Sequence, residues 1–330
     1  MSKKLASWDS VIILLTVVVL IVASLTVDNF GTGRNFTFLT LDTLPIILVA
    51  LPMTMIIVTG EIDLSVASTL GLTSSIMGFL WNHGMAIQTI VPLCIVLGAV
   101  AGAVNGFLVT GLGLPSLAVT IGTLALYRGL AFVVLGDGAV ADFPYNWSSW
   151  VTGTFGGGSI PHVLLLIAVL ALIFGIVQHA TPVGRSLYAI GANAQAAHFS
   201  GIRVARTKFW LYVVSGAVCG LVGVLWTLRY SSARADNGSG LELAVVAAVL
   251  LGGVSIFGGK GSLPGVLAGV VLLAALQNAL RLEDVSGQAL NIVTGALLVL
   301  SVLLPNIVTA IRGSWQRRKL RQAPRSVNPA

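Results

Sequence analysis

Charge is what this sequence has least of: its 18 basic and 11 acidic side chains make up 9% of 330 residues. A soluble globular domain has about 25% charged residues, so this chain cannot cover a folded surface with groups that face water. Only two cysteines, Cys94 and Cys219, are present, and both lie in long apolar runs. That scarcity excludes a disulfide-stapled secreted scaffold. The mean hydropathy of +0.97 indicates a polytopic membrane protein instead.

The residue sets that enzymes use are also missing. The four histidines lack the spacing of metal ligands, and no G-x-S-x-G nucleophile pattern occurs. Residues 253–262 look like a phosphate-binding loop, but Val254 and Gly261 stand where that motif requires glycine and serine or threonine. We therefore expect no catalytic residues, no metal and no bound cofactor, and no ATP hydrolysis by this chain.

Long apolar runs occupy most of the chain. A transmembrane helix needs about 20 predominantly apolar residues, and ten segments meet or approach that length. The predicted fold is therefore an all-α polytopic membrane protein, with about ten transmembrane helices in a single domain over residues 1–330. The expected spans are 8–26, 44–59, 64–82, 87–111, 115–135, 161–179, 207–228, 241–257, 263–280 and 288–311.

Basic residues cluster at three places. Lys3 and Lys4 precede the first span, four basic residues lie in a middle loop at 179–208, and six lie in a tail at 312–330. Cytoplasmic loops carry the excess of Lys and Arg, and ten spans put all three places on one side. Both termini are therefore expected in the cytoplasm. Dispersed charges beside the membrane suit anionic lipid headgroups, so the net charge of +7 predicts contact with membrane lipid rather than nucleic acid.

Small residues recur every four positions in two of the spans. Gly98, Gly102 and Gly106 share one helix face, as do Gly216 and Gly220 on another helix. Glycines at this spacing let helix backbones approach closely in lipid, where there is no hydrophobic force between helices. We interpret both sets as packing surfaces.

Three ionisable residues, Glu61, Asp63 and Arg128, fall within or between apolar spans. Each such group costs roughly 2.5–3.5 kcal/mol at the bilayer centre, so it needs a partner or a function. Asp63 directly precedes a helical run, which predicts an N-cap that accepts from the N–H groups of Ser65 and Val66; a place in a translocation path is the alternative. Arg128 either pairs with a carboxylate or lines a polar path. A transporter driven by a proton or sodium gradient usually needs more buried carboxylates than this chain has, so we expect transport to be driven by an external energy source.

Three amides also lie inside apolar helices: Asn105, Gln277 and Asn278. They either form hydrogen bonds between helices or line a path in which they pass along the hydroxyl groups of a neutral solute. The candidate translocation residues are therefore Glu61, Asp63, Asn105, Arg128, Gln277 and Asn278.

The middle loop has the composition of a short, capped helix. Asn193 is a suitable N-cap, residues 194–200 can form two turns, and Gly201 can adopt the left-handed conformation that ends a helix. Ile202 would then fold back onto Ala196 or Ala197. Capping at both ends predicts a stiff helix on the cytoplasmic side, and such a helix suits the transmission of force from a docked partner.

Three ordered motifs resemble one protein family. The first motif consists of Gly184-Arg185, Ala189-Ile190-Gly191, Asn193, Ala196-Ala197 and Ser200-Gly201-Ile202. The second motif is Gly60-Glu61-Ile62-Asp63-Leu64-Ser65-Val66. The third motif consists of Glu242-Leu243, Gly252-Gly253 and Gly258-Gly259-Lys260-Gly261. The first motif resembles the coupling loop of ABC importer permeases for monosaccharides, the ribose, xylose, rhamnose and autoinducer-2 group. That group is akin to the branched-chain amino acid permeases. The resemblance covers nearly the whole chain.

This resemblance implies a type II-like importer permease in the bacterial inner membrane. Its expected partners are a separate ABC ATPase subunit that binds the ATP, a second permease, identical or paralogous, and an extracytoplasmic sugar-binding protein. The coupling helix at 193–200 would dock in a groove of the ATPase. The residues implied in coupling are Gly191, Asn193, Ala196, Ala197, Ser200 and Gly201.

The substrate expected from the resemblance is L-rhamnose. Residues 115–124, Tyr127-Arg128-Gly129 and the Glu61 variant of the second motif look closest to an L-rhamnose permease. Residues 229–234 are similar to the autoinducer-2 permease, so ribose, xylose, a polyol or autoinducer-2 are alternatives. An ion-coupled secondary transporter is the alternative of another class.

Overall fold

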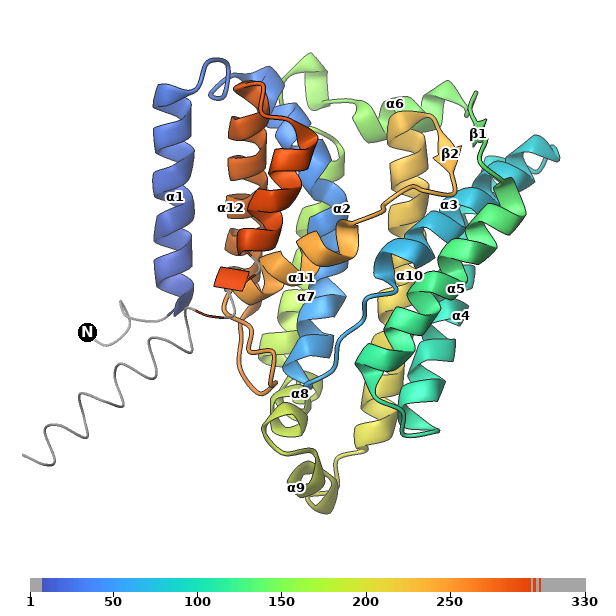
Figure 1. Ribbon diagram of the computed structural model, residues 1–330, viewed down its shortest axis with the longest axis vertical. Helices are drawn as coiled ribbons and strands as arrows, with labels where there is room; N and C mark the ends of the chain where they lie inside the picture. The colour runs from blue at the N-terminus through green and yellow to red at the C-terminus, as the bar shows by residue number, and fades with distance from the viewer. Residues whose placement is uncertain (1–7, 298, 301–302, 304–330) are drawn as a thin grey trace, which may run out of the picture.

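The protein is a bundle of helices with one very short two-stranded sheet (Figure 1). The computed structural model describes residues 8–297, 299–300 and 303. Its helices are α1 (Trp8–Thr26), α2 (Gly33–Val58), α3 (Val66–Asn82), α4 (Ile87–Thr110), α5 (Ser116–Leu135), α6 (Tyr145–Thr152), η1 (Phe155–Gly157), α7 (Val163–Ala180), α8 (Pro182–Ala192), α9 (Ala194–Phe199), α10 (Val204–Tyr230), α11 (Leu241–Leu251) and α12 (Leu263–Leu282). The strands β1 (Ala139–Val140) and β2 (Ala233–Arg234) pair antiparallel.

The predicted all-helical membrane fold is confirmed, and each predicted span falls on a helix. Within the described residues, seven helices are long and apolar enough to cross a membrane: α1, α2, α4, α5, α7, α10 and α12. Helix α3 has 17 residues, and the last predicted span is helical over 287–297 but lies partly outside the described residues.

Two predicted boundaries were wrong. Helix α2 begins at Gly33 rather than at residue 44, because the Thr32 side chain caps it by accepting from the N–H of Asn35. Helix α11 ends at Leu251, well before residue 257, because Gly253 takes a positive φ of 92° and the chain turns there. Helix α11 is therefore too short to span the bilayer.

Helix α2 forms the centre of the bundle. Its residues from Leu48 to Leu51 have no exposed surface, and it contacts α7, α10, α11 and α12. A helix that is apolar on every side is stable only when other helices surround it or lipid does. Helix α1, by contrast, exposes large side chains such as Leu14 and Leu25, which suits a position at the lipid boundary.

Two irregular segments enter the bundle from opposite ends. Helix α2 ends near α8 and α9, and residues 59–65 then run back into the middle of the bundle, where α3 begins (Figure 1). Residues 235–240 descend from β2 at the other end to the start of α11, again at mid-height (Figure 1). We refer to residues 59–65 and 235–240 as the two re-entrant segments. Non-helical backbone at this depth is tolerated only where protein or a water-filled cavity satisfies it.

Helices α4 and α10 pack against each other through their glycines, as the spacing predicts. A Cβ atom on Gly98 would overlap the carbonyl oxygen of Gly216, and one on Gly102 would overlap that of Tyr212. The two backbones therefore approach as closely as the absence of side chains permits.

We expect Gly102→Leu to destabilise the protein by forcing α4 and α10 apart. The matched control is Gly122→Leu on α5, because a Cβ at Gly122 would meet nothing within 4 Å. Thermal unfolding in detergent, followed by loss of monodisperse protein, should show a clear decrease in melting temperature for Gly102→Leu alone. Equal melting temperatures for the two variants would contradict this packing.

Candidate functional site

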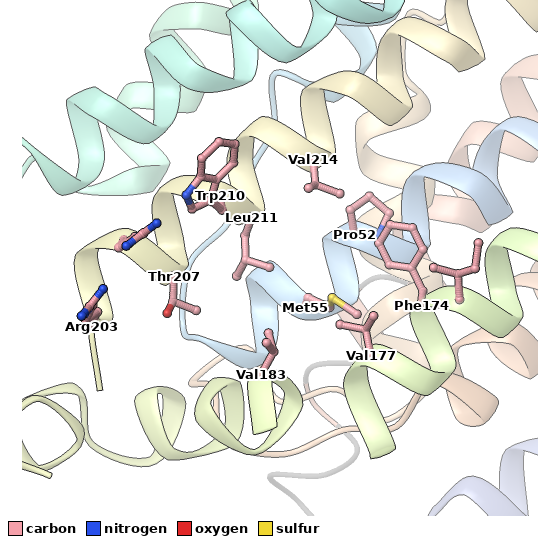
Figure 2. A pocket seen from close by; sticks show the side chains of 12 residues that line it. Pro52, Met55, Phe174, Val177, Val183, Arg203, Thr207, Trp210, Leu211 and Val214 are labelled. Carbon is pink, nitrogen blue, oxygen red and sulfur yellow. The ribbon is translucent and has the colours of Figure 1, made fainter. Parts of the chain in front are cut away.

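A groove on the side of the bundle is apolar and therefore unsuited to a hydroxylated solute. It lies between α2, α7 and α10, encloses about 590 Å³, and is lined mainly by hydrocarbon side chains such as Met55, Phe174 and Leu211 (Figure 2). A polar solute in this groove would lose its hydrogen bonds to water without replacement. The candidate path is therefore sought among the polar residues of the two re-entrant segments.

Asp63 is the centre of a buried polar cluster on the first re-entrant segment. Its Oδ1 accepts from the backbone N–H (3.0 Å) and the hydroxyl (2.6 Å) of Ser65, and its Oδ2 accepts from Ser215 (3.3 Å). The Asn105 amide donates to the Ser65 hydroxyl at 2.8 Å. Asp63 is 2% exposed, so these hydrogen bonds replace the water that its carboxylate would otherwise require.

This geometry confirms that Asp63 accepts from the N–H of Ser65 but moves the N-cap position from Asp63 to Ser65. Helix α3 begins at Val66 with Ser65 in the N-cap position, so Asp63 closes the turn before the helix rather than capping the helix itself. Asn105 of α4 does bond to the residue that precedes α3, which agrees with the interpretation that it links helices rather than lines a path. Its Oδ1 atom, however, is buried without a hydrogen-bond partner in the structure. An unpartnered buried acceptor is costly, and it gives this cluster unused capacity for hydrogen bonding.

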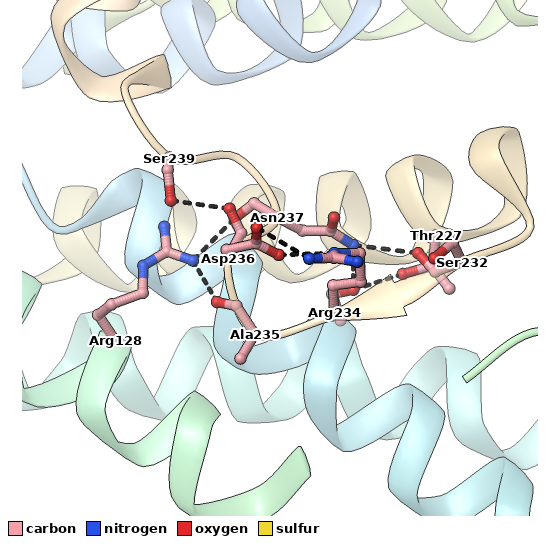
Figure 3. A network of polar contacts seen from close by, with 9 residues as sticks. Arg128, Thr227, Ser232, Arg234, Ala235, Asp236, Asn237 and Ser239 are labelled. Atoms are coloured by element: carbon pink, nitrogen blue, oxygen red, sulfur yellow. Dashed lines mark hydrogen bonds and ion pairs between the residues drawn. The ribbon is translucent and has the colours of Figure 1, made fainter. Parts of the chain in front are cut away.

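Arg128 of α5 joins α3 to the second re-entrant segment. Its guanidinium donates to the carbonyl oxygens of Ala235, of Asn237 (2.9 Å) and of Ala67 (3.2 Å) (Figure 3). The expected carboxylate partner is therefore wrong: the described hydrogen bonds and ion pairs of Arg128 go to backbone oxygens. These carbonyls belong to irregular backbone and to the first turn of α3, and one planar guanidinium with five N–H donors can reach all three.

The surface beside Arg128 is polar and partly open. The Asn237 amide donates to Ser74 (2.9 Å) and to the carbonyl of Ser232 (3.1 Å), while Asp236 and Arg234 form an exposed ion pair at 2.8 Å (Figure 3). We call Arg128, Asp236, Asn237 and Ser239 the polar face. The segment that carries the polar face runs from β2 at the end of the bundle to mid-height at α11 (Figure 1). Exposed polar groups along such a segment are incompatible with hydrocarbon, so the polar face suits a water-filled path.

Glu61 lies near the start of the first re-entrant segment. Its carboxylate forms an ion pair with Lys208 of α10, and the two side chains are 17% and 14% exposed. Lys208 therefore ties the first re-entrant segment to the helix that follows the coupling loop. The candidate list did not include Lys208, although opposite charges at two apolar boundaries could have suggested the pair.

Gln277 and Asn278 belong neither to the polar cluster around Asp63 nor to the polar face. The Asn278 amide exchanges hydrogen bonds with Asn35 of α2 at 2.8 and 3.1 Å, and Gln277 donates to Thr294 at 2.8 Å. Both residues thus form interhelical hydrogen bonds, the first of the two interpretations. The structure does not bring them together with Glu61, Asp63, Asn105 or Arg128.

The predicted coupling loop at 179–208 folds into two short helices, α8 and α9, rather than one. Asn193 lies between them, and its side chain accepts from the N–H of Ala196 at 2.9 Å, so the predicted N-cap is confirmed. The predicted C-terminus is confirmed as well: Gly201 has φ 85°, and the N–H of Ile202 donates to the carbonyl of Ala197 at 3.1 Å. Helix α9 projects from the end of the bundle (Figure 1).

The residues of α9 and of the turn that follows it fall into a buried and an exposed set. Ala197 is 4% exposed and faces the protein, whereas Ala196, Ser200 and Gly201 are exposed. Phe199, at 79% exposure, is absent from the candidate list. The sequence could have indicated Phe199, because it is a large aromatic side chain among small residues and exposed aromatics are typical of binding surfaces.

Gly191, in the last turn of α8, lies against the end of α2 and against the loop before α12. A Cβ there would overlap the carbonyl of Val58, where α2 ends, and the backbone N–H of Gly259 in the loop before α12. That same Gly259 N–H donates to the Val58 carbonyl at 2.8 Å. We call Val58, Gly191 and Gly259 the glycine junction. Tyr188 of α8 reinforces it by donating to the carbonyl of Gly261 at 2.8 Å.

Comparison with known proteins identifies the family. Residues 35–302 match the family described as branched-chain amino acid transport system, permease component. The Autoinducer 2 import system permease protein LsrD of Yersinia enterocolitica is 35% identical over 272 residues, which are 81% of this chain and 82% of that protein. LsrD of Photorhabdus temperata is 33% identical over 296 residues, 87% and 88% of the two chains.

One solved structure is similar in outline. It is described as a metal-chelate type ABC transporter in an inward-facing conformation, and it covers 92% of this chain and 99% of its own at 15% identity and a TM-score of 0.47. The family match and the two relatives suffice without it. The chain belongs to the family of branched-chain amino acid transport system permease components and is a multi-pass protein of the inner membrane.

Proposed function

We propose that this chain is the permease subunit of an ATP-driven importer for a small, neutral, hydroxylated solute. The observation that carries the proposal is the glycine junction, which places the end of α8, directly before the exposed helix α9, in backbone contact with the end of α2 and with the loop before α12. A separate ATPase subunit that moves α9 would displace the ends of α2 and of the loop before α12. The permease itself supplies the path and hydrolyses nothing.

The polar face supports a path shared with a second permease. It is open in the single chain, and hydrocarbon cannot cover it, so a second copy or a paralogue would complete the wall around water. An extracytoplasmic binding protein would deliver the solute at the end of the bundle where β1 and β2 lie. Population shift between outward-open and inward-open states would then give direction to the transport.

The relatives favour autoinducer-2 as the solute. Both LsrD proteins are named for its import, which corresponds to one of the alternatives from the sequence and does not bear out the preference for L-rhamnose. The motifs around Arg128 remain the argument for L-rhamnose. Uptake of each labelled compound into vesicles that contain both permeases, the ATPase and the binding protein distinguishes the two. An ion-coupled transporter would instead take up solute without ATP.

We expect Gly201→Val to uncouple transport from ATP hydrolysis. Valine at a left-handed position costs about 1–2 kcal/mol, and the strain falls on the end of α9. Gly201→Asn is the matched control, since asparagine tolerates this conformation. In reconstituted vesicles, Gly201→Val should lose at least tenfold in ATP-driven uptake while Gly201→Asn retains most of it. Equal uptake by both variants would contradict a role for the α9 terminus in coupling.

Gly191→Ala tests the junction itself. Even a methyl group at residue 191 overlaps the Val58 carbonyl, so the variant should reduce ATP-driven uptake roughly tenfold by separating α8 from the end of α2 and from the loop before α12. Gly175→Ala on α7 is the control, because its Cβ would meet only Leu263 at 3.7 Å. Both variants should insert into the membrane and bind the ATPase. Normal uptake by Gly191→Ala would show that the contact transmits nothing.

Arg128→Gln tests the polar face. Glutamine is shorter and has two N–H donors, so it leaves carbonyls of the second re-entrant segment unsatisfied. We expect uptake to fall at least tenfold. The control is Arg34→Gln, which removes an exposed charge stacked on Phe38 at 5.7 Å and should leave uptake near the wild-type rate. Retention of uptake by Arg128→Gln would remove Arg128 from the path.

A further inference from the structure

We propose that the groove between α2, α7 and α10 binds one anionic phospholipid of the cytoplasmic leaflet. This inference is independent of the transported solute and of the polar face. It rests on three observations: the apolar walls of the groove, two arginines without ion-pair partners at one end of it, and the order of residues along α10.

The floor and walls of the groove are hydrocarbon. Pro52 and Met55 of α2 form part of the lining, with Phe174 of α7 and Leu211 of α10 on either side (Figure 2). Met55, Phe174 and Leu211 are each less than 10% exposed, so these side chains are fixed by packing and the groove exists before any ligand binds. Lipid tails are as apolar as these side chains, and an acyl chain can fill this groove without any loss of hydrogen bonds.

The cytoplasmic end of the groove is positively charged. Arg203 and Thr207 line it there (Figure 2). Arg206, which follows Arg203 by three residues at the start of α10, also lines the groove. The basic side chains that form ion pairs within the described residues are Lys208, Arg229, Arg234 and Arg281; Arg203 and Arg206 are exposed and belong to none of these pairs. A phosphate is a natural partner for two such guanidinium groups, because their N–H donors match its oxygens.

The sequence of α10 matches the layers of a phospholipid. Arg203, Arg206, Trp210 and Val214 follow at intervals of three or four residues, so they share one helix face, and all of them line the groove. From Arg203 to Val214 the helix rises about 16 Å. This distance takes the face from charge, through a half-exposed tryptophan of the kind found at membrane interfaces, to hydrocarbon. A phosphate, the glycerol region and an acyl chain have the same order of polarity.

Native mass spectrometry of the assembled transporter, purified from membranes and delipidated stepwise, tests the proposal. We expect one phosphatidylglycerol to remain on each copy of the wild-type permease after the other lipids are lost. The double variant Arg203→Gln/Arg206→Gln should retain it roughly tenfold less. Arg185→Gln is the control, since Arg185 is an exposed arginine of α8 that does not line the groove, and it should retain the lipid as the wild type does.

A second variant separates the headgroup site from the acyl site. Val214→Trp fills the groove and should release phosphatidylglycerol although both arginines remain. Two results would overturn the proposal: equal retention by the double arginine variant and Arg185→Gln, or equal retention of phosphatidylcholine and phosphatidylglycerol by the wild type. Crosslinking of Val214→Cys to the second permease would also overturn it, because the groove would then be a protein interface.

Discussion

The structure depends on satisfying backbone polar groups where the chain is not helical inside the membrane. Two segments, 59–65 and 235–240, leave helical geometry within the bundle, and lipid offers no hydrogen bonds to such backbone. Arg128 satisfies three carbonyls with one side chain, and Asp63 accepts a backbone N–H at 3.0 Å. Asp63 thus compensates for the first break and Arg128 for the second. A continuous helix would need neither charge, but it would leave no opening for a solute.

Under the proposed function, the breaks also explain how movement of α8 and α9 would reach a path deep in the protein. Helix α8 is anchored by Leu187 and Ile190, which are 0% and 2% exposed, and Gly191 brings its backbone against the end of α2. The first re-entrant segment starts directly after that end. Lys208 holds the same segment to α10 through Glu61. Force applied at α9 therefore has two short routes to the interior, one through the glycine junction and one through this ion pair.

Local features could be predicted from the sequence because they depend on a few neighbouring residues. Within the described residues the apolar runs predicted where helices lie, although not every helix end, and the caps at Asn193 and Gly201 followed from side-chain and backbone preferences. Long-range pairing could not be predicted. Arg128 donates to backbone carbonyls rather than to a carboxylate. Every residue has such a carbonyl, so the sequence does not identify which ones Arg128 contacts. The early end of α11 and the contact between Gly191 and Val58 likewise depend on segments far apart in the chain, which no local pattern encodes.

The most direct measurement of the central claim, that the polar face borders water within the membrane, is cysteine accessibility. Cys94 and Cys219 are both fully buried, so the native background is low. In membranes that contain the assembled transporter, Ser239→Cys on the polar face should react with a charged, water-soluble thiol reagent, at a rate that changes when ATP is added. Leu165→Cys, at a position that is 59% exposed on the apolar helix α7, should remain unreactive, because we expect an exposed side chain on such a helix to face lipid. Equal lack of reaction at both positions would contradict the account.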